Sequence, residues 1–231
     1  MEAIHRLQGE LEAISINMNL PQEIDEVITN SIIDSQRGPV QGIPLMNTAP
    51  DFTLPDMIGG AVNLYDELKK GPVILSFFRG EWCPYCSMQL QFLQQYFKEF
   101  KKHKANVISV HPQKIEVSEM VTSKYMIEFP VLSDPDTEIM ELYKVKFNLS
   151  DDMIKAHKEG LGLDLAKLNV NGRWNLPVPA TFIIDTDRVI KGRHFSHNYR
   201  TLMDPVDILT VLKNLPEVTP EKMVNVQGHG Q

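Results

Sequence analysis

The sequence has few or none of several features that would point to particular protein classes. It has no dense cluster of Lys and Arg, and its formal net charge is −7, so no electrostatic footprint for nucleic acid or an anionic membrane is present. Its longest apolar run, residues 72–78, is far too short to cross a bilayer. We find no low-complexity tract and no internal repeat, so nucleic-acid, membrane and repeat-array functions are not expected.

The N-terminus carries acidic residues early and lacks the continuous apolar run of a secretory signal. We therefore expect a cytoplasmic protein. Cysteine is also scarce, because Cys83 and Cys86 are the only two in 231 residues. Cytosolic thiols are normally kept reduced, so a close pair is more often catalytic or metal-binding than a structural staple.

The chain divides into segments of different character. Residues 1–43 are expected to form an arm of two short amphipathic helices, because the helical pattern of residues 3–36 ends at a Gly- and Pro-rich stretch. A single domain is expected over residues 44–215, with an insertion at 145–178 that contains a short helix. The last residues, 216–231, are too polar and too rich in Pro and Gly to pack.

Strand and helix patterns alternate within the domain. Continuous apolar character over residues 72–78 indicates a strand buried on both faces, and helical patterns follow at 84–100, 114–125, 135–143 and 204–215. The alternation implies βαβ units and a mostly parallel sheet. Two further strands, in ATFIID and RVIKGRHF, are close enough to form an antiparallel hairpin at one edge.

The cysteine pair falls at the start of the first helix after the buried strand. An apolar stripe runs along this helix at four-three spacing, through Cys86, Leu90, Leu93, Phe97 and Phe100. Unpaired N–H groups and the helix dipole stabilise a thiolate at such a position, so Cys83 is the candidate nucleophile. Cys86, one turn further on, should be less exposed and less ionised, and is placed to close a disulfide with Cys83.

Two other interpretations of the pair are weaker. A zinc site would need two more ligands, and the spacings of His103 with His111 and of His194 with His197 match no common pattern. The second alternative is a buried cysteine with an inert neighbour. No metal and no cofactor are expected.

At these residues the sequence resembles the thioredoxin superfamily, and more closely its peroxiredoxin-like branch of the alkyl hydroperoxide reductase and thiol-specific antioxidant type. The resemblance is carried by APDFTLPD, FFRGEWCPYC, FPVLSDPD and LPVPATFIID. It implies an α/β protein with a thioredoxin-like fold, in which helices flank a mixed central sheet. It also implies a redox-active CxxC pair.

The sequence departs from peroxiredoxins at the positions that hold the peroxide. Where those proteins have PxxxTxxC, this chain has Ser76 at the Pro position and Gly80 at the Thr position. Their distant Arg would fall at Pro179, where the sequence is more similar to the cis-proline turn of thioredoxin. Val178 and Pro179 are therefore a candidate cis pair, and the Val178 backbone a candidate contact for an extended substrate. Thioredoxin's buried Asp corresponds to Phe77, which leaves the proton acceptor of Cys86 open.

Two neighbours of Cys83 are candidates for positioning a substrate. Arg79 could supply the missing cation, lowering the thiol pKa and orienting a hydroperoxide; the alternative is a surface arginine at a strand end. Trp82 could form an apolar platform on which a partner docks, or could simply pack. His194, His197 and Arg200 form a polar cluster that we interpret as a solvated loop.

The sequence thus predicts a thiol-dependent oxidoreductase, a peroxidase of peroxiredoxin-like type. Cys83 would reduce a hydroperoxide and Cys86 would resolve the product as an intramolecular disulfide. Thioredoxin, glutaredoxin or glutathione would then restore the dithiol, and a homodimer is compatible with the sequence. The alternatives are a thioredoxin-like protein disulfide oxidoreductase using the same dithiol, and a non-enzymatic redox sensor whose disulfide switches a surface.

Overall fold

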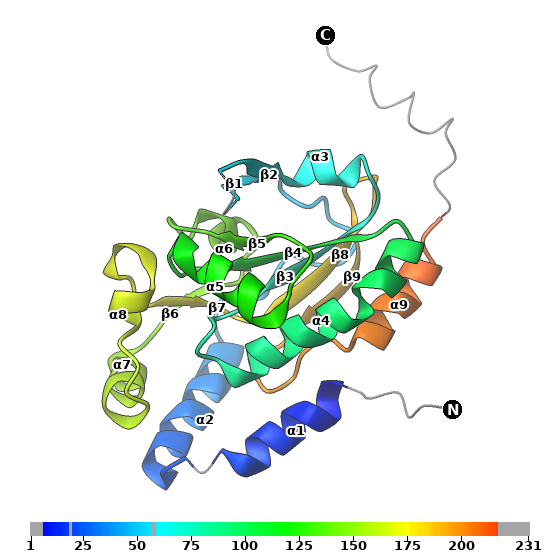
Figure 1. Ribbon diagram of the computed structural model, residues 1–231. Coiled ribbons are helices and arrows are strands. Elements are labelled where there is room, and N and C mark those ends of the chain that lie inside the picture. The colour runs from blue at the N-terminus through cyan, green and yellow to red at the C-terminus, as the bar shows by residue number, and fades with distance from the viewer. Residues whose placement is uncertain (1–6, 19, 57–58, 217–231) are drawn as a thin grey trace.

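A five-stranded mixed sheet forms the centre of the protein (Figure 1). The computed structural model describes residues 7–18, 20–56 and 59–216. The strands lie in the order β5-β4-β3-β8-β9, with bounds Val131–Ser133, Asn106–His111, Val73–Phe77, Ala180–Ile184 and Ile190–Phe195. The pairs β3/β4 and β4/β5 are parallel, whereas β3/β8 and β8/β9 are antiparallel. The sheet is therefore mixed, as the family resemblance implied, rather than mostly parallel.

Strand β3 is the central strand because both of its faces are covered. All five of its residues are buried, which confirms the strand expected from the apolar run. Its side chains alternate between two hydrophobic clusters. Ile74 faces one of these clusters, while Val73, Leu75 and Phe77 face the other. The chain leaves β3 at the carboxyl edge of the sheet, where the cysteine pair follows.

The helices around the sheet agree with the expected positions and differ mainly in length. Helix α4 runs over Pro84–Lys102, α5 over Ile115–Tyr125 and α9 over Pro205–Lys213. Helix α6, Glu138–Leu142, is shorter than its pattern predicted. Outside the sheet, a hairpin of β1 (Thr53–Pro55) and β2 (Ala61–Asn63) leads into α3 (Leu64–Leu68). Among the described residues, no helix combines the length and apolar character needed to cross a bilayer.

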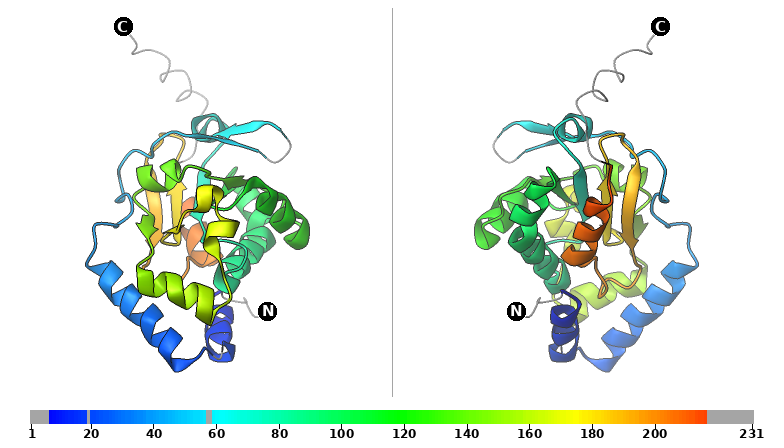
Figure 2. Two further views of the ribbon diagram at one scale, coloured as in Figure 1. Left: turned by 90° about the vertical axis from the view of Figure 1, so that its left-hand side faces the viewer. Right: turned by 90° about the vertical axis from the view of Figure 1, so that its right-hand side faces the viewer.

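The N-terminal segment forms the two expected helices, α1 (Leu7–Asn17) and α2 (Gln22–Gln36). Helix α1 contacts α4, with Leu7 and Leu11 fully buried and the Leu7 N–H donating to Asp204 Oδ2 at 3.0 Å. Helix α2 contacts the insertion, as both views in Figure 2 show. The two helices therefore connect α4 to the insertion across the end of the sheet that carries the cysteines.

The segment expected to be an insertion with one short helix contains several elements. They are β6 (Lys146–Asn148), α7 (Asp151–Lys155), the π-helical turn η1 (Ala156–Gly160), α8 (Leu165–Leu168), the 3-10 turn η2 (Val170–Gly172) and β7 (Asn175–Pro177). Strands β6 and β7 pair antiparallel and close the segment at its base. Ser150 caps α7 by accepting from the Met153 N–H at 3.3 Å. The polar tail expected at 216–231 lies, except for its first residue, outside the described residues.

Candidate active site

Cys83 is the N-cap residue of α4 and ends the loop that follows β3. Its backbone is extended, Pro84 occupies the first helical position, and its carbonyl accepts from the Ser87 N–H at 3.0 Å. The N–H groups of Tyr85 and Cys86 face the Cys83 sulfur and favour its thiolate form. The predicted position at a helix start is confirmed.

A buried polar network holds the loop before Cys83. The Gln113 Oε1 accepts from the Glu81 N–H at 2.8 Å, and the Gln113 N–H donates to His111 Nδ1 at 3.1 Å. Burial lowers the pKa of His111 to about 3, so its ring is neutral; because Nδ1 accepts, Nε2 carries the proton and donates to Ser118 Oγ at 2.8 Å. The loop is thereby fixed from the side of β4 and α5.

Gly80 is required where this loop passes close to Gln113 and Trp82. Its φ is +151°, and an added Cβ would lie 2.5 Å from Trp82 Nε1 and 2.6 Å from Gln113 Oε1. Gly80→Ala should therefore destabilise the fold by roughly 1–3 kcal/mol, from backbone strain alone, and displace the loop. Urea unfolding measures this, with Gly60→Ala as control because no atom lies within 4 Å of a Cβ there. Equal unfolding midpoints for the two variants would contradict the expectation.

The two thiols differ strongly in acidity. Both are buried, Cys83 with 1% and Cys86 with 0% of its surface exposed, and both are free. Burial opposes ionisation of Cys83, but the Cys86 thiol, the Arg79 charge and the N–H groups of α4 outweigh it and lower the pKa of Cys83 to about 7. Burial, followed by the neighbouring Cys83, raises the pKa of Cys86 well above its usual value. Cys83 is the more ionised thiol, as its position predicted.

Arg79 is buried beside the pair, with 4% of its surface exposed. Its guanidinium carbon lies 4.4 Å from the Tyr199 ring centroid and 5.0 Å from that of Trp82, and its Nη2 lies 3.3 Å from His157 Nε2. The interpretation of Arg79 as a surface arginine is therefore wrong. Its positive charge favours the thiolate of Cys83.

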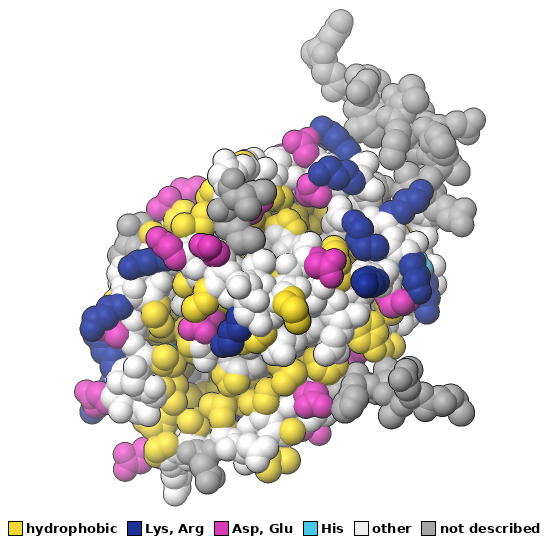
Figure 3. All heavy atoms as spheres, in the orientation of Figure 1, with side chains coloured by type: hydrophobic (Ala, Val, Ile, Leu, Met, Phe, Trp, Pro, Cys, Tyr) yellow, Lys and Arg dark blue, Asp and Glu magenta, His cyan; other side chains and the backbone are white. Residues whose placement is uncertain are grey.

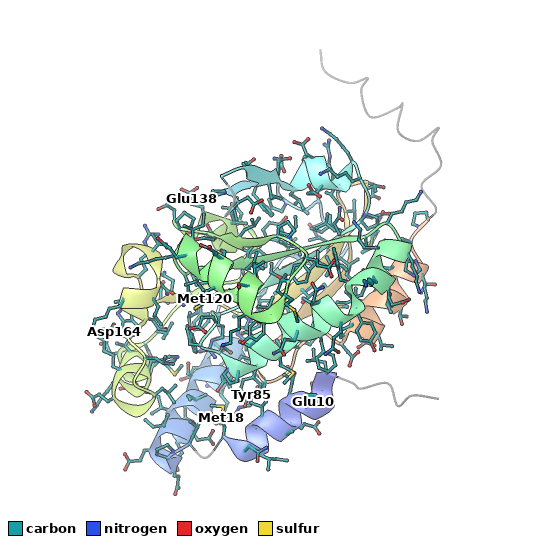
Figure 4. All side chains as sticks on the ribbon, viewed as in Figure 1. Glu10, Met18, Tyr85, Met120, Glu138 and Asp164 are labelled. Atoms are coloured by element: carbon teal, nitrogen blue, oxygen red, sulfur yellow. The ribbon has the colours of Figure 1, made fainter. Side chains whose placement is uncertain are left out.

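A cavity of about 230 Å³ opens onto Cys83. Its walls combine the pair's own loop with the N-terminal helices, the insertion and the segment after β9, through residues that include Met18, Ile28, Trp82, His157, Leu163 and Tyr199. Figure 4 shows Met18 and Tyr85 side by side where the end of α1 approaches the start of α4. The cavity is mostly apolar, with Arg79 as its cation.

Trp82 is half-buried and packs edge-to-face against His157, with ring centroids 5.7 Å apart. It lies beside Cys83 and forms part of the cavity wall. Its packing role is thus visible in the structure, and its role as a docking platform stays a prediction.

Val178 and Pro179 do not form the thioredoxin-like element. No peptide bond of the described residues is cis, so the expected cis bond is wrong; X–Pro bonds in folded proteins are trans in about 95% of cases. The Val178 N–H donates to Val145 O at 2.8 Å, which leaves no free N–H there for a substrate chain. Both residues line a separate cavity of about 30 Å³ on another side of Arg79, so Pro179 contributes to the surroundings of the arginine.

Sequence reasoning did not identify His157 and Tyr199, two residues of the cavity wall that contact Arg79. His157 lies in the insertion, where no motif marked it. Tyr199 lies between members of the polar cluster predicted to be a solvated loop; Tyr199 is buried, and His194, His197 and Arg200 are only partly exposed, so that prediction is wrong. Arg200 Nη2 donates to Asp25 Oδ1 of α2 at 2.6 Å. The sequence HNYR, which places a Tyr beside basic residues after the last strand, was the one signal available.

In the part of the chain that the structure describes, neither Phe77 nor Glu81 takes the place of thioredoxin's buried Asp. Phe77, at the corresponding position, faces the opposite side of the sheet, and Glu81 is only partly buried. The backbone N–H of Arg79 faces the Cys86 sulfur instead. Among residues 7–18, 20–56 and 59–216, no three His, Cys, Asp or Glu side chains are grouped so that they could hold a metal ion.

Comparisons with known proteins give one family and a consistent fold. The AhpC/TSA family model matches residues 45–193. The thiol-disulfide oxidoreductase ResA of Bacillus subtilis is 26% identical over 166 residues, which are 68% of this chain and 74% of that protein. The chloroplastic peroxiredoxin Q of Sedum lineare is 29% identical over 103 residues, 45% of this chain, so the chain spans about half (55%) of that relative.

Among solved structures, the peroxidoxin BcpB of Mycobacterium tuberculosis superposes with a TM-score of 0.60 at 22% identity. The superposition covers 76% of this chain and 99% of that protein. At this identity the likeness supports the fold, a thioredoxin-like mixed sheet flanked by helices.

Proposed function

The chain belongs to the AhpC/TSA family, and we propose that it is a peroxiredoxin-like thiol peroxidase in which Cys83 reduces a hydroperoxide and Cys86 resolves the product. The observation that carries this proposal is a thiol of depressed pKa beside a buried guanidinium in one cavity. A thiolate is the reactive form of cysteine, and a fixed cation stabilises the charge that leaves with the peroxide oxygen.

The reaction balances with the groups at the site. The Cys83 thiolate attacks one peroxide oxygen, the O–O bond breaks, and the alkoxide leaves as an alcohol after taking a proton, which gives a sulfenic acid at Cys83. Cys86, as thiolate, then attacks the Cys83 sulfur: the S–S bond forms, the S–O bond breaks, and the hydroxide leaves as water after taking a proton. An external dithiol, or two molecules of a monothiol, then supplies two electrons and two protons and restores the dithiol.

Burial favours a small oxidant as the first substrate. Only 1% of Cys83 is exposed, and thiol–disulfide exchange requires the attacking sulfur to reach a substrate disulfide directly. A hydroperoxide can enter a cavity of about 230 Å³, whereas a folded protein disulfide cannot reach Cys83 unless the surrounding segments move. Likeness to ResA proteins keeps protein disulfide exchange as the second candidate.

We further propose thioredoxin, glutaredoxin or glutathione as the reductant and the cytoplasm as the location. A pair of thiols that must be returned to the reduced state in each cycle fits a compartment where thiols are kept reduced. A protein reductant would need apolar surface on which to dock: Figure 3 shows hydrophobic side chains gathered in the lower part of the face that Figure 1 presents, where Figure 1 places α1 and the start of α4. Whether two copies form a homodimer is tested by the protein's mass in solution.

The test is a single-turnover reaction of pre-reduced protein with stoichiometric hydrogen peroxide or cumene hydroperoxide under anaerobic conditions. Two thiols should be lost per peroxide, roughly 10²–10³-fold faster than from free cysteine. The Trp82 fluorescence should change with the same rate in a Trp174→Phe background, which leaves Trp82 as the reporter of the two tryptophans.

Cys83→Ser is the control and should abolish the fast phase. A rate equal to that of free cysteine would refute the peroxidase. Fast reduction of a protein disulfide by the same protein would then favour the second candidate, and a clean dithiol/disulfide transition without turnover of either substrate would favour a redox sensor.

A further inference from the structure

His157 is a buried histidine of the insertion that reaches the arginine beside the nucleophile. It stands 78 residues from Arg79 in the sequence, and its Nε2 lies 3.3 Å from Arg79 Nη2. Only 1% of its surface is exposed, and it forms part of the wall of the Cys83 cavity. Its two ring nitrogens have different partners, and these partners determine where its proton lies.

The tautomer of His157 follows from those partners. Nδ1 lies 2.7 Å from the Met153 carbonyl oxygen, which can only accept, so Nδ1 carries the proton. Nε2 faces a guanidinium, which can only donate, so Nε2 presents its lone pair to Arg79. Burial first, and then the Arg79 charge, lower the pKa of His157 to about 4. The ring is therefore neutral at pH 7 and accepts a hydrogen bond from Arg79.

The remaining contacts of Arg79 are also neutral. Its guanidinium lies over the rings of Tyr199 and Trp82, and burial raises the pKa of Tyr199, so its phenol is uncharged at pH 7. Within the described residues, no carboxylate forms an ion pair with Arg79. Arg200, which also lies over the Tyr199 ring, is paired with Asp25. Cys83 and Tyr85 also line the cavity, and Cys86 lies beside Cys83; of the two thiols, only Cys83 ionises near neutral pH.

We propose that His157 is a positioning residue for the Cys83 reaction: it fixes the Arg79 guanidinium through an uncharged acceptor and so leaves the whole positive charge to the thiolate and the bound oxidant. A carboxylate in its place would hold the arginine equally well but would cancel its field at Cys83. This proposal rests on the proposed role of Cys83 as nucleophile. It also assigns a function to the insertion, which delivers His157 to the site.

The turn that carries His157 is itself tightly held. It is a π-helical turn, closed by the Leu161 N–H donating to Ala156 O at 3.1 Å, and such turns are frequent at functional sites. A Cβ added to Gly160 in the same turn would lie 2.3 Å from Ile24 Cδ1 of α2. The close contact with α2 limits movement of the turn and keeps the imidazole against Arg79.

The experiment measures the thiolate of Cys83 directly, without peroxide, from the pH dependence of iodoacetamide alkylation in a Cys86→Ser background. His157→Gln places an oxygen acceptor near the position of Nε2 and should keep the midpoint near 7. His157→Glu has the shape of the Gln variant but adds a negative charge, and His157→Leu has no acceptor. Both should move the midpoint of the alkylation profile to about 8.5 or above. The alkylation rate at pH 7 should then fall roughly tenfold in both.

His194→Leu is the matched control, since His194 is a partly buried histidine outside the cavity, and its midpoint should stay unchanged. Far-UV circular dichroism and melting show which variants fold. If His157→Leu does not fold, the comparison of His157→Gln with His157→Glu still tests the proposal. Equal alkylation midpoints for these two variants would overturn it. If the parent protein reacts slowly with peroxide but the alkylation midpoint still shifts in the Glu and Leu variants, the peroxidase is refuted and the positioning role of His157 is supported.

Discussion

Replacing Arg79 by methionine should slow the reaction of Cys83 with hydroperoxide by roughly 10²–10³-fold, the loss seen when one fixed electrostatic donor is removed from an active site. Two effects combine. The thiolate loses the cation that offsets its burial, so the pKa of Cys83 rises from about 7. The departing oxygen also loses the nearest positive charge.

The pH profile separates these two effects. The thiolate is the reactive form, so the rate of the parent protein should rise with pH through about 7 and then level off. In Arg79→Met the rise should continue to higher pH, because burial then dominates the thiol. Any deficit that remains on the high-pH plateau measures the stabilisation of the leaving oxygen.

Arg188→Met provides a matched control for the loss of a stacked arginine, because the Arg188 guanidinium lies 4.3 Å from the Tyr65 ring centroid and outside the cavity. It should react at the parent rate. If Arg79→Met also reacted at the parent rate with an unchanged midpoint, Arg79 would have only a packing role.

Arg79→Lys should recover part of the rate, because it keeps the charge but loses the planar contact with the rings.

The local parts of the site could be predicted from sequence because their signals are local. The apolar run of β3, together with the apolar residues spaced four and three apart along α4, places Cys83 at a helix start and Cys86 on the inner face of that helix. The direction of the acidity difference between the two thiols could be predicted from that placement, although the Cys86 thiol and the Arg79 charge contribute more to it than the helix N–H groups do. The antiparallel hairpin of β8 and β9 likewise followed from two nearby strand patterns.

The surroundings of Arg79 could not be predicted in the same way. His157 comes from an insertion and Tyr199 from the segment after β9, and their approach to Arg79 depends on how whole elements pack. The burial of Arg79 is a consequence of that packing, so sequence alone left a surface position open. The cis bond at Val178 and Pro179 was inferred from a short motif, and the structure instead holds the Val178 N–H against Val145.

The second large effect is expected for Cys86→Ser, which should leave the peroxide step fast and abolish the disulfide. One thiol should be lost per peroxide instead of two, and mass spectrometry after trapping with dimedone should find a sulfenic acid at Cys83. The serine hydroxyl can still donate to the Cys83 thiolate, so the first rate should change little. Disulfide formation in this variant, which could only be intermolecular, would contradict the role of Cys86.

The pH dependence of the parent protein should also separate the peroxide step at Cys83 from the disulfide step at Cys86. Burial is the larger cause of the raised pKa of Cys86, and it remains after Cys83 has become an uncharged sulfenic acid. Below that pKa the thiolate fraction of Cys86 grows tenfold per pH unit, so the second step should accelerate about tenfold between pH 7 and pH 8. The first step changes little over this range. Stopped-flow traces should therefore separate into a nearly pH-independent phase and a strongly pH-dependent phase, and a disulfide step that is flat from pH 7 to 8 would show that another group removes the Cys86 proton.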